Sequence, residues 1–234
     1  MKSYGKIARL WRYPVKSFLG ESCNRLFIDS QGVSGDRWFA ISNKQGKFGS
    51  GKNTRRFCKI DGLFDFKAKY DRDLLQITFP DGRIFKEQDP NLDKELSSYL
   101  GQAVTLTSEK KVSHFDADAL HIITTASLQW LKNILPKSTI DERRFRPNLL
   151  IDLPGQELIE HNWLGQKILL GEEVEIKITD LTERCIMTDF AQRELDYDRR
   201  INKTINKQAK HNFGVYAKVV KQGTVCQGDL VRGL

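Results

Sequence analysis

The sequence lacks the close cysteine pairs that mark common metal sites. Only four cysteines occur in 234 residues, namely Cys23, Cys58, Cys185 and Cys226, and the nearest two are 35 positions apart. No CxxC pair is therefore present to form a zinc knuckle or an iron–sulfur cluster. Disulfides are not expected either, because a cytosolic chain of this size can bury a core without them.

Long apolar runs are also missing. Residues 1–20 alternate apolar with basic side chains and contain no continuous apolar region like that of a signal peptide. No stretch approaches the roughly 20 apolar residues that cross a bilayer. We therefore expect a cytoplasmic protein without a membrane partner.

The charge balance is basic but mixed. The chain has 38 Lys and Arg against 30 Asp and Glu, which gives a formal charge of +8. One dense basic stretch comprises Arg199, Arg200, Lys203, Lys207 and Lys210. It falls on a predicted helix whose other face carries Ile201, Ile205 and Ala209, so a solvated helix face explains it as well as a nucleic-acid site does. We expect no nucleic-acid partner, and an anionic small ligand also fits the surplus.

The first half of the chain is mostly short strands in the predicted secondary structure. The expected strands are 6–15, 24–29, 37–42, 67–70 and 74–79, separated by turns such as 43–46 and 80–82. A helix then begins at Asp89-Pro90 and ends at Gly101, and Leu92, Leu96, Tyr99 and Leu100 share one of its faces. Short strands at this spacing predict a barrel or sandwich covered by the helix.

The second half combines helices with further strands. A helix is expected at about 125–135, and the basic helix lies near 196–210. The expected strands are 148–153, 167–170, 174–180, 215–220 and 229–232. The predicted fold class is α+β, mainly β: an N-terminal β-barrel-like domain at 1–110, followed by a second β-barrel domain with a few helices at 111–234. The boundary, near 105–120, is soft.

Four short segments carry a resemblance to a known family. In chain order they are Tyr13-Pro14-Val15-Lys16-Ser17, Gly35-Asp36-Arg37-Trp38, Phe145-Arg146-Pro147-Asn148 and Arg184-Cys185, supported by segments 115–118, 124–128 and 223–229. In this order and spacing they resemble the MOSC family, in the form with an N-terminal MOSC β-barrel domain that includes the amidoxime-reducing proteins. The resemblance implies that 1–110 is this N-terminal domain and that 111–234 is the MOSC domain.

Arg146 and Asn148 flank a proline. Pro147 disfavours the helical conformation for Arg146, and in an extended chain residues two apart point the same way. The two side chains are therefore expected to face one pocket, where Arg can grip a phosphate and Asn can bind the edge of a pterin ring. A surface arginine beside a turn is the alternative.

Lys16, Ser17 and Arg37 are the candidate residues of the first half. Pro14 fixes the chain direction before Lys16 and Ser17, which would place a cation and a hydroxyl at a strand exit as a seat for phosphate. An ordinary strand end with a solvated lysine is equally compatible with the pattern. Asp36 could orient Arg37, or the two could form a surface pair of little energetic weight.

Cys185 is the candidate metal ligand and catalytic residue. Most free cysteines are buried and inert, but a neighbouring cation such as Arg184 favours the thiolate, which is the form that binds metals. In the family that the chain resembles, the equivalent cysteine coordinates molybdenum beside the dithiolene sulfurs of the cofactor. Cys23, Cys58 and Cys226 match no ligand position and are interpreted as structural.

The resemblance implies a molybdenum cofactor (Mo-molybdopterin) and an oxidoreductase that reduces N-hydroxylated compounds. The expected cofactor-binding residues are Lys16, Ser17, Arg37, Arg146, Asn148 and Arg184. The chain has no fused ferredoxin motif, so the electrons would come from a separate flavin or iron–sulfur protein. One departure is Gly49-Ser50-Gly51-Lys52, where many relatives have Thr-Ala-Arg-Gln, so that Lys52 would offer a point charge in place of an arginine fork.

Two other functions are compatible with the sequence. Cys185 could carry a persulfide, or the protein could pass the cofactor on, because MOSC domains resemble the C-terminal part of cofactor sulfurases; this would be a non-catalytic sulfur or cofactor carrier. A nucleic-acid-binding barrel would need aromatic and basic residues interleaved on one strand face. Arg9, Trp11 and Tyr13 offer only a trace of that pattern.

Overall fold

The computed structural model describes residues 2–109, 114 and 118–234. Contacts within the chain divide it into two compact units, each made of more than one segment. Unit 1 comprises residues 1–11, 22–34 and 117–234, and unit 2 comprises residues 12–21 and 35–116. The predicted segment 115–118 lies, apart from Asp118, outside the described residues. The division into domains 1–110 and 111–234 stays a prediction.

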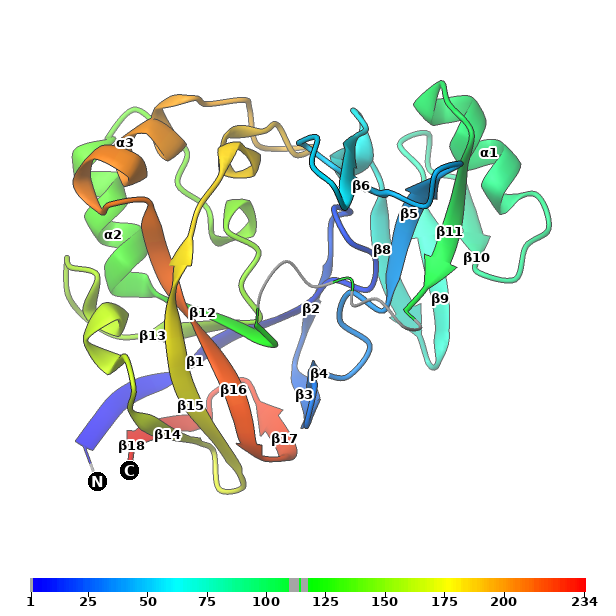
Figure 1. The fold of residues 1–234 in the computed structure, drawn as a ribbon. Coiled ribbons are helices and arrows are strands. Elements are labelled where there is room, and N and C mark those ends of the chain that lie inside the picture. The colour runs from blue at the N-terminus through cyan, green and yellow to red at the C-terminus, as the bar shows by residue number, and fades with distance from the viewer. Residues whose placement is uncertain (1, 110–113, 115–117) are drawn as a thin grey trace. The chain divides into compact units, whose positions relative to one another are not determined.

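Unit 1 is built on a closed β-barrel (Figure 1). Its strands, in ring order, are β13 (Leu149–Asp152), β12 (Leu120–Thr124), β16 (Asn212–Lys221), β15 (Val174–Glu183), β14 (Lys167–Leu170), β18 (Leu230–Gly233) and β1 (Lys2–Arg12). β1 pairs back onto β13 to close the ring, and β2 (Glu21–Cys23) extends the sheet beyond β1. Only β12 and β13 run parallel to each other among these barrel pairings. The mainly β prediction is confirmed.

The first strand does not follow simple alternation. Its buried residues, Tyr4, Ile7 and Leu10, are three apart because the register shifts twice along the strand. A β-bulge inserts one residue and so changes which side chains face the core. Gly5 lies in one of these shifts at φ +97, where a Cβ would come within 2.0 Å of the Asp152 carbonyl oxygen. Only glycine fits there.

Helices cover one side of the barrel in unit 1. α2 (Thr125–Ile134) and α3 (Arg200–Gln208) pack with Phe145 and Phe213 in an apolar cluster that includes Ile201 and Ile205, and they lie next to each other in Figure 1. The short helices are η2 (Glu142–Arg144), η3 (Ile159–Trp163) and η4 (Ile186–Asp189), and a small sheet is formed by β17 (Gly223–Cys226), β3 (Arg25–Asp29) and β4 (Gly32–Val33). The basic side chains of α3 are exposed, and its apolar residues Ile201 and Ile205 are buried, as the predicted two faces of this helix require.

Unit 2 consists of two small sheets and one helix. One sheet contains β11 (Val104–Ser108), β5 (Phe39–Asn43), β6 (Phe48–Ser50) and β7 (Phe57–Lys59); the other contains β10 (Ile84–Lys86), β9 (Leu74–Thr78) and β8 (Lys67–Asp71). η1 (Leu63–Asp65) and α1 (Leu92–Leu100) complete the unit. α1 buries Leu92 and Leu96 in the same core as Phe66 and Phe79, and it ends at Gly101 with φ +66, as predicted.

No helix in the described part of the chain combines the length and the apolar character that crossing a membrane requires.

Candidate functional site

A polar cluster in unit 1 is organised around His121 on β12. The His121 side chain is 3% exposed. Its Nδ1 lies 3.3 Å from the carbonyl oxygen of Arg146, and its Nε2 lies 3.5 Å from Nη1 of Arg184. Because a guanidinium can only donate, Nε2 accepts and the ring proton is on Nδ1, where it faces the Arg146 carbonyl. These contacts bring segment 145–148 and the end of β15 to one place.

Glycine makes room for this histidine. Gly214 on β16 has φ +86, and a Cβ there would lie 2.6 Å from Nε2 of His121 and 2.7 Å from the carbonyl oxygen of Ile122. Both the backbone conformation and the close approach therefore require glycine at this position.

Arg146 is not extended, so the predicted conformation before Pro147 is wrong. Its φ is +53, in the left-handed region. The physical reason is the short helix η2 directly before it: the Arg146 N–H donates to the Arg143 carbonyl at 3.2 Å, which is the way a helix ends with a left-handed residue just beyond its C-cap. The argument that Arg146 and Asn148 face one pocket because they are two apart in a strand is lost with it.

The side chain of Asn148 binds the barrel itself. Its Oδ1 accepts from the backbone N–H of His121 at 3.1 Å, and its Nδ2 donates to the Trp11 carbonyl at 3.4 Å. Its backbone also bonds to both strands, with N–H donation to His121 and acceptance from Trp11. Asn148 thus joins β13 to β12 and to the end of β1, and one amide N–H remains for another partner.

Arg184 and Cys185 follow the last residue of β15. The Arg184 Nη2 donates to the Phe145 carbonyl at 2.8 Å, and the guanidinium lies 5.7 Å from the Phe145 ring centroid. Its backbone N–H donates to His211 at 2.7 Å. Cys185 is a free, half-buried thiol immediately before η4, and its carbonyl accepts from the Thr188 hydroxyl at 3.1 Å. The thiol therefore lies on a chain segment that is held from both sides.

Lys16 and Ser17 lie in unit 2. Lys16 is not a solvated strand end: it is 3% exposed, and its Nζ lies 4.7 Å from the centre of the Phe57 ring. Ser17 has φ +64, and its hydroxyl donates to the Gly49 carbonyl at 3.1 Å. The solvated-lysine alternative is therefore wrong, and the role of these two residues as a seat for phosphate stays a prediction.

Asp36 and Arg37 also lie in unit 2, and the surface alternative for them is wrong. Asp36 is 3% exposed and pairs with the Arg37 guanidinium, while its other oxygen accepts from the Tyr13 N–H at 2.6 Å. Arg37 has φ +50, and its guanidinium lies 5.2 Å from the Tyr13 ring centroid. His114, near the end of the segment 35–116, also contacts Arg37: its Nδ1 lies 3.1 Å from the Arg37 carbonyl oxygen. Burial lowers the pKa of this imidazole.

Left-handed backbone is concentrated at predicted site residues. Seven described residues other than glycine have positive φ, namely Ser17, Arg37, Arg72, Arg146, Arg193, Lys210 and His211. Three of them, Ser17, Arg37 and Arg146, are among the six cofactor-binding residues predicted from the sequence. This conformation costs about 1 kcal/mol or more per residue and tends to persist where function requires a particular direction of the chain.

The sequence reasoning missed His121, Arg144 and His114. His121 interrupts an otherwise apolar strand, which is a visible signal for a buried polar group. Arg144 is 1% exposed and donates to the carbonyls of Thr139, Phe190 and Asp196, but nothing in Glu142-Arg143-Arg144 distinguishes it from its partly exposed neighbours. Among the described residues, no group of three or more His, Cys, Asp or Glu could hold a metal ion.

Models of two domain types match the sequence. The MOSC N-terminal beta barrel domain matches residues 4–137, and the MOSC domain matches residues 109–232. Each match covers more than half of the chain. The protein belongs to the MOSC family. MOSC domains are associated with binding of the molybdenum cofactor.

The chain is also similar to individual known proteins. Mitochondrial amidoxime-reducing component 1 of Mus musculus is 25% identical over 232 aligned positions, covering 80% of this chain and 66% of the relative. The chain thus spans just under two thirds of that protein's length. Among solved structures, the YUAD protein from Bacillus subtilis matches with a TM-score of 0.54 and 14% identity, covering 97% of this chain and 93% of that one. At this identity the likeness concerns the fold alone.

Proposed function

We propose that this MOSC protein is a molybdenum cofactor-binding oxidoreductase that reduces N-hydroxylated compounds with electrons from a separate reductase. The observation that carries the proposal is the half-buried thiol of Cys185, directly after an arginine that is held by Phe145 and His121. The name of the mouse relative, an amidoxime-reducing component, points to the same chemistry. The reaction would be R–NH–OH + 2 electrons + 2 H⁺ → R–NH₂ + H₂O.

The residues fit such a cofactor in kind. Cys185 would supply one thiolate ligand to the metal, since soft sulfur ligands suit a centre that also has dithiolene sulfurs. When bound, the cofactor would supply the redox and oxygen-transfer chemistry, while the protein supplies binding and orientation.

The remaining predicted residues would hold the organic part of the cofactor. Lys16, Ser17 and Arg37 offer cations and a hydroxyl, which are suited to a phosphate. Arg146 and Arg184 would bind the pterin, and Asn148 has one amide N–H left for it. His121 is a positioning residue in this proposal, because it fixes the Arg146 carbonyl and the Arg184 guanidinium and has no direct role in the reaction.

The first test compares metal content in three proteins purified from a host that makes the cofactor. Wild type and Cys226→Ser, which removes an exposed thiol on β17, are expected to contain similar molybdenum and pterin. Cys185→Ser is expected to lose most of the metal and at least about 100-fold in turnover of a hydroxylamine-type substrate with dithionite-reduced methyl viologen.

The results separate the proposal from its alternatives. Equal molybdenum in wild type and Cys185→Ser would remove Cys185 from the ligand role. Molybdenum in the wild type without any viologen-driven turnover would favour a carrier of the cofactor or of sulfur. Turnover with NADH alone would contradict the need for a separate reductase.

A further inference from the structure

Unit 2 contains a long stretch of sequence with charge of one sign. From position 37 to position 60 there is no Asp or Glu, and the seven charged residues are Arg37, Lys44, Lys47, Lys52, Arg55, Arg56 and Lys59. Elsewhere acidic and basic residues are mixed, since the whole chain has 30 of one and 38 of the other. The surplus charge of the protein is therefore concentrated here.

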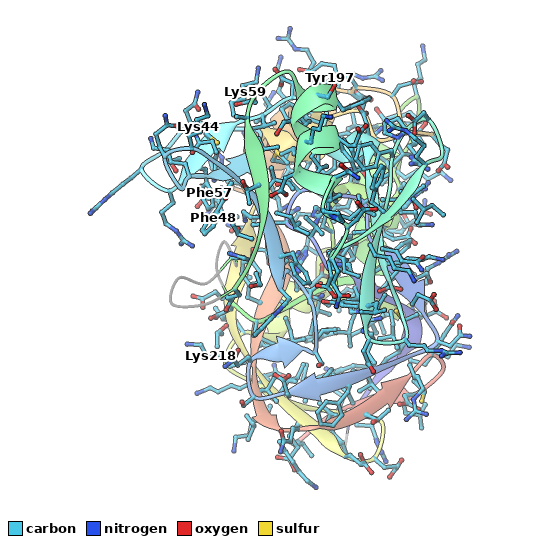
Figure 2. All side chains as sticks on the ribbon, turned by 90° about the vertical axis from the view of Figure 1, so that its right-hand side faces the viewer. Lys44, Phe48, Phe57, Lys59, Tyr197 and Lys218 are labelled. Atoms are coloured by element: carbon cyan, nitrogen blue, oxygen red, sulfur yellow. The ribbon has the colours of Figure 1, made fainter. Side chains whose placement is uncertain are left out.

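The structure places most of these cations on the turn and the loop that connect the strands of one small sheet. β6 and β7 run parallel, joined by the loop 51–56, and β5 pairs with β6 on the other side. The side chains of Lys44, Lys52, Arg55, Arg56 and Lys59 are exposed. We call Lys44 to Lys59 the basic segment. In Figure 2, Lys44 and Lys59 lie in the same region of the view as the aromatic residues Phe48 and Phe57.

Three of the cations of unit 2 lie close to one aromatic ring, that of Phe57. Nζ of Lys16 lies 4.7 Å from the Phe57 ring centroid, Cζ of Arg56 lies 5.3 Å from it, and Nζ of Lys52 lies 5.7 Å from it. The negative face of a ring attracts cations within about 6 Å. The cations also repel one another, so binding an acidic group would relieve repulsion as well as form new ion pairs.

The loop that carries these cations is held by hydrogen bonds. The Thr54 hydroxyl oxygen accepts from the backbone N–H groups of Arg56 at 3.2 Å and Phe57 at 3.1 Å. The Asn53 side chain accepts from the Lys59 N–H at 2.8 Å. A charged surface that is ordered in advance loses less entropy when it binds a partner.

The aromatic residues argue against a nucleic-acid partner. Single strands of RNA or DNA are bound by stacking bases on exposed aromatic rings between basic residues. Phe57 is only 7% exposed, and Phe48 packs edge-on against His114 at 4.6 Å between ring centroids. The basic segment therefore offers charge without a surface for stacking.

We propose that the basic segment is the docking surface for the electron-donor protein and that this donor presents an acidic face. The inference rests on the proposed function, which requires two electrons per substrate from a protein partner. Complementary charge of this kind accelerates association and weakens steeply with salt. It names the surface and the sign of the partner, which the family assignment does not.

The test uses the complete holoprotein and two charge-reversal variants of equal net change. Lys44→Glu/Arg55→Glu alters the basic segment, and Lys203→Glu/Lys207→Glu alters the exposed face of α3. An acidic flavodoxin, reduced by its own reductase, is the protein probe. Dithionite-reduced methyl viologen is the donor that needs no docking surface.

The expected result is specific to one donor and one surface. At low salt, Lys44→Glu/Arg55→Glu should lower kcat/KM for flavodoxin about tenfold and flatten its salt dependence. Viologen-driven turnover should stay unchanged, and Lys203→Glu/Lys207→Glu should change both rates less than about twofold.

Several outcomes would overturn the proposal. One is an equal loss of kcat/KM for flavodoxin in both variants. Another is a loss of viologen-driven turnover in Lys44→Glu/Arg55→Glu. A third is a wild type that turns over with viologen but not with flavodoxin. Tighter binding of single-stranded RNA than of flavodoxin through the same residues would make the partner a nucleic acid. If wild type shows no viologen-driven turnover, the proposed function fails by itself, and direct flavodoxin binding by the two variants still tests the surface.

Discussion

The two units bury a carboxyl group in opposite ways. In unit 2, Asp36 meets the Arg37 guanidinium and the Tyr13 N–H, two groups that stabilise a negative charge. In unit 1, Glu160 is 0% exposed and accepts hydrogen bonds from hydroxyls and from backbone N–H groups; Thr124 Oγ1 donates at 2.8 Å and Ser127 Oγ donates at 2.6 Å. Burial raises the pKa of Glu160, and these hydrogen bonds oppose the rise only in part.

A buried cation in unit 1, Arg144, is also bound by neutral groups, as the buried Glu160 is. The guanidinium of Arg144 binds three carbonyl oxygens, and burial lowers its pKa although the aspartates around it, first among them Asp198, act in the other direction. Asp36 in unit 2 thus pairs directly with a cation, whereas Glu160 and Arg144 in unit 1 are bound by neutral hydrogen-bonding groups. The difference predicts where removing one partner costs most, because an uncompensated buried ion is far more costly than an unmet dipole.

The largest loss of unfolding free energy is expected from Asp36→Ala. Without the carboxylate, the Arg37 guanidinium stays mostly buried with its ion-pair partner gone and the Tyr13 N–H loses its acceptor. Loss of one member of a buried pair costs about 3–5 kcal/mol. Urea denaturation, followed by the fluorescence of Trp38, the single tryptophan of unit 2, measures the free energy of unfolding.

A matched control is Asp81→Ala in the same unit. Asp81 also pairs with an arginine, Arg83, at 2.7 Å, but both side chains are about half exposed. Its removal should change the unfolding free energy little, because water screens such pairs. Similar losses of unfolding free energy in Asp36→Ala and Asp81→Ala would show that burial does not determine how much the Asp36 pair stabilises the protein.

A smaller and more local effect is expected from Arg144→Met. The variant keeps an apolar stem of similar length but removes the donors from Thr139, Phe190 and Asp196, at a cost of about 2–3 kcal/mol. Two of these carbonyls bound the loop 190–196 that follows η4. Hydrogen exchange should therefore accelerate in residues 190–198 more than in the barrel strands. Arg143→Met should cause a much smaller acceleration, because the ion pair of Arg143 with Glu194 in the same loop is exposed to water. Uniform acceleration across unit 1 would contradict a local role for Arg144.

Much of the fold was predictable because its signals are local. β14 was placed within its observed limits, α1 was stopped correctly at Gly101, and the apolar stripe of α3 was identified from Ile201 and Ile205. The strands β2, β4, β6, β7, β10, β11, β12 and β17 were not predicted. β6 and β7 are only three residues each, and their pairing depends on contacts that no local pattern shows.

For the candidate site, the conformation was the part that the sequence could not predict. The order of short motifs predicts Arg146 and Cys185 as site residues, and this stays a prediction; the extended conformation predicted for Arg146 is wrong because η2 ends just before it. His121 could not be connected to Arg184 from the sequence, since 63 positions separate them and only the pairing of β12, β16 and β15 brings them together. Local rules do not describe such long-range closure.

Among these variants, Glu160→Gln is expected to change the free energy of unfolding least at acid pH. Its effect appears in how the free energy of unfolding varies with pH. A protonated glutamic acid and a glutamine have nearly the same shape and can both bond to Thr124 and Ser127. A raised pKa means that the folded protein holds one proton more than the unfolded chain at pH values above the ordinary glutamate value of 4.5. The stability due to Glu160 is then complete below that value and is lost as pH rises toward the raised pKa. Relative to Glu160→Gln, wild type should lose up to about 1.4 kcal/mol of unfolding free energy per pH unit in this window and level off beyond it.

Urea denaturation at a series of pH values measures the difference, with the exposed Glu157→Gln on the preceding loop as the control. Parallel curves for wild type and Glu160→Gln would mean that the buried carboxyl keeps its charge without a cation, and the contrast between the two units would then disappear.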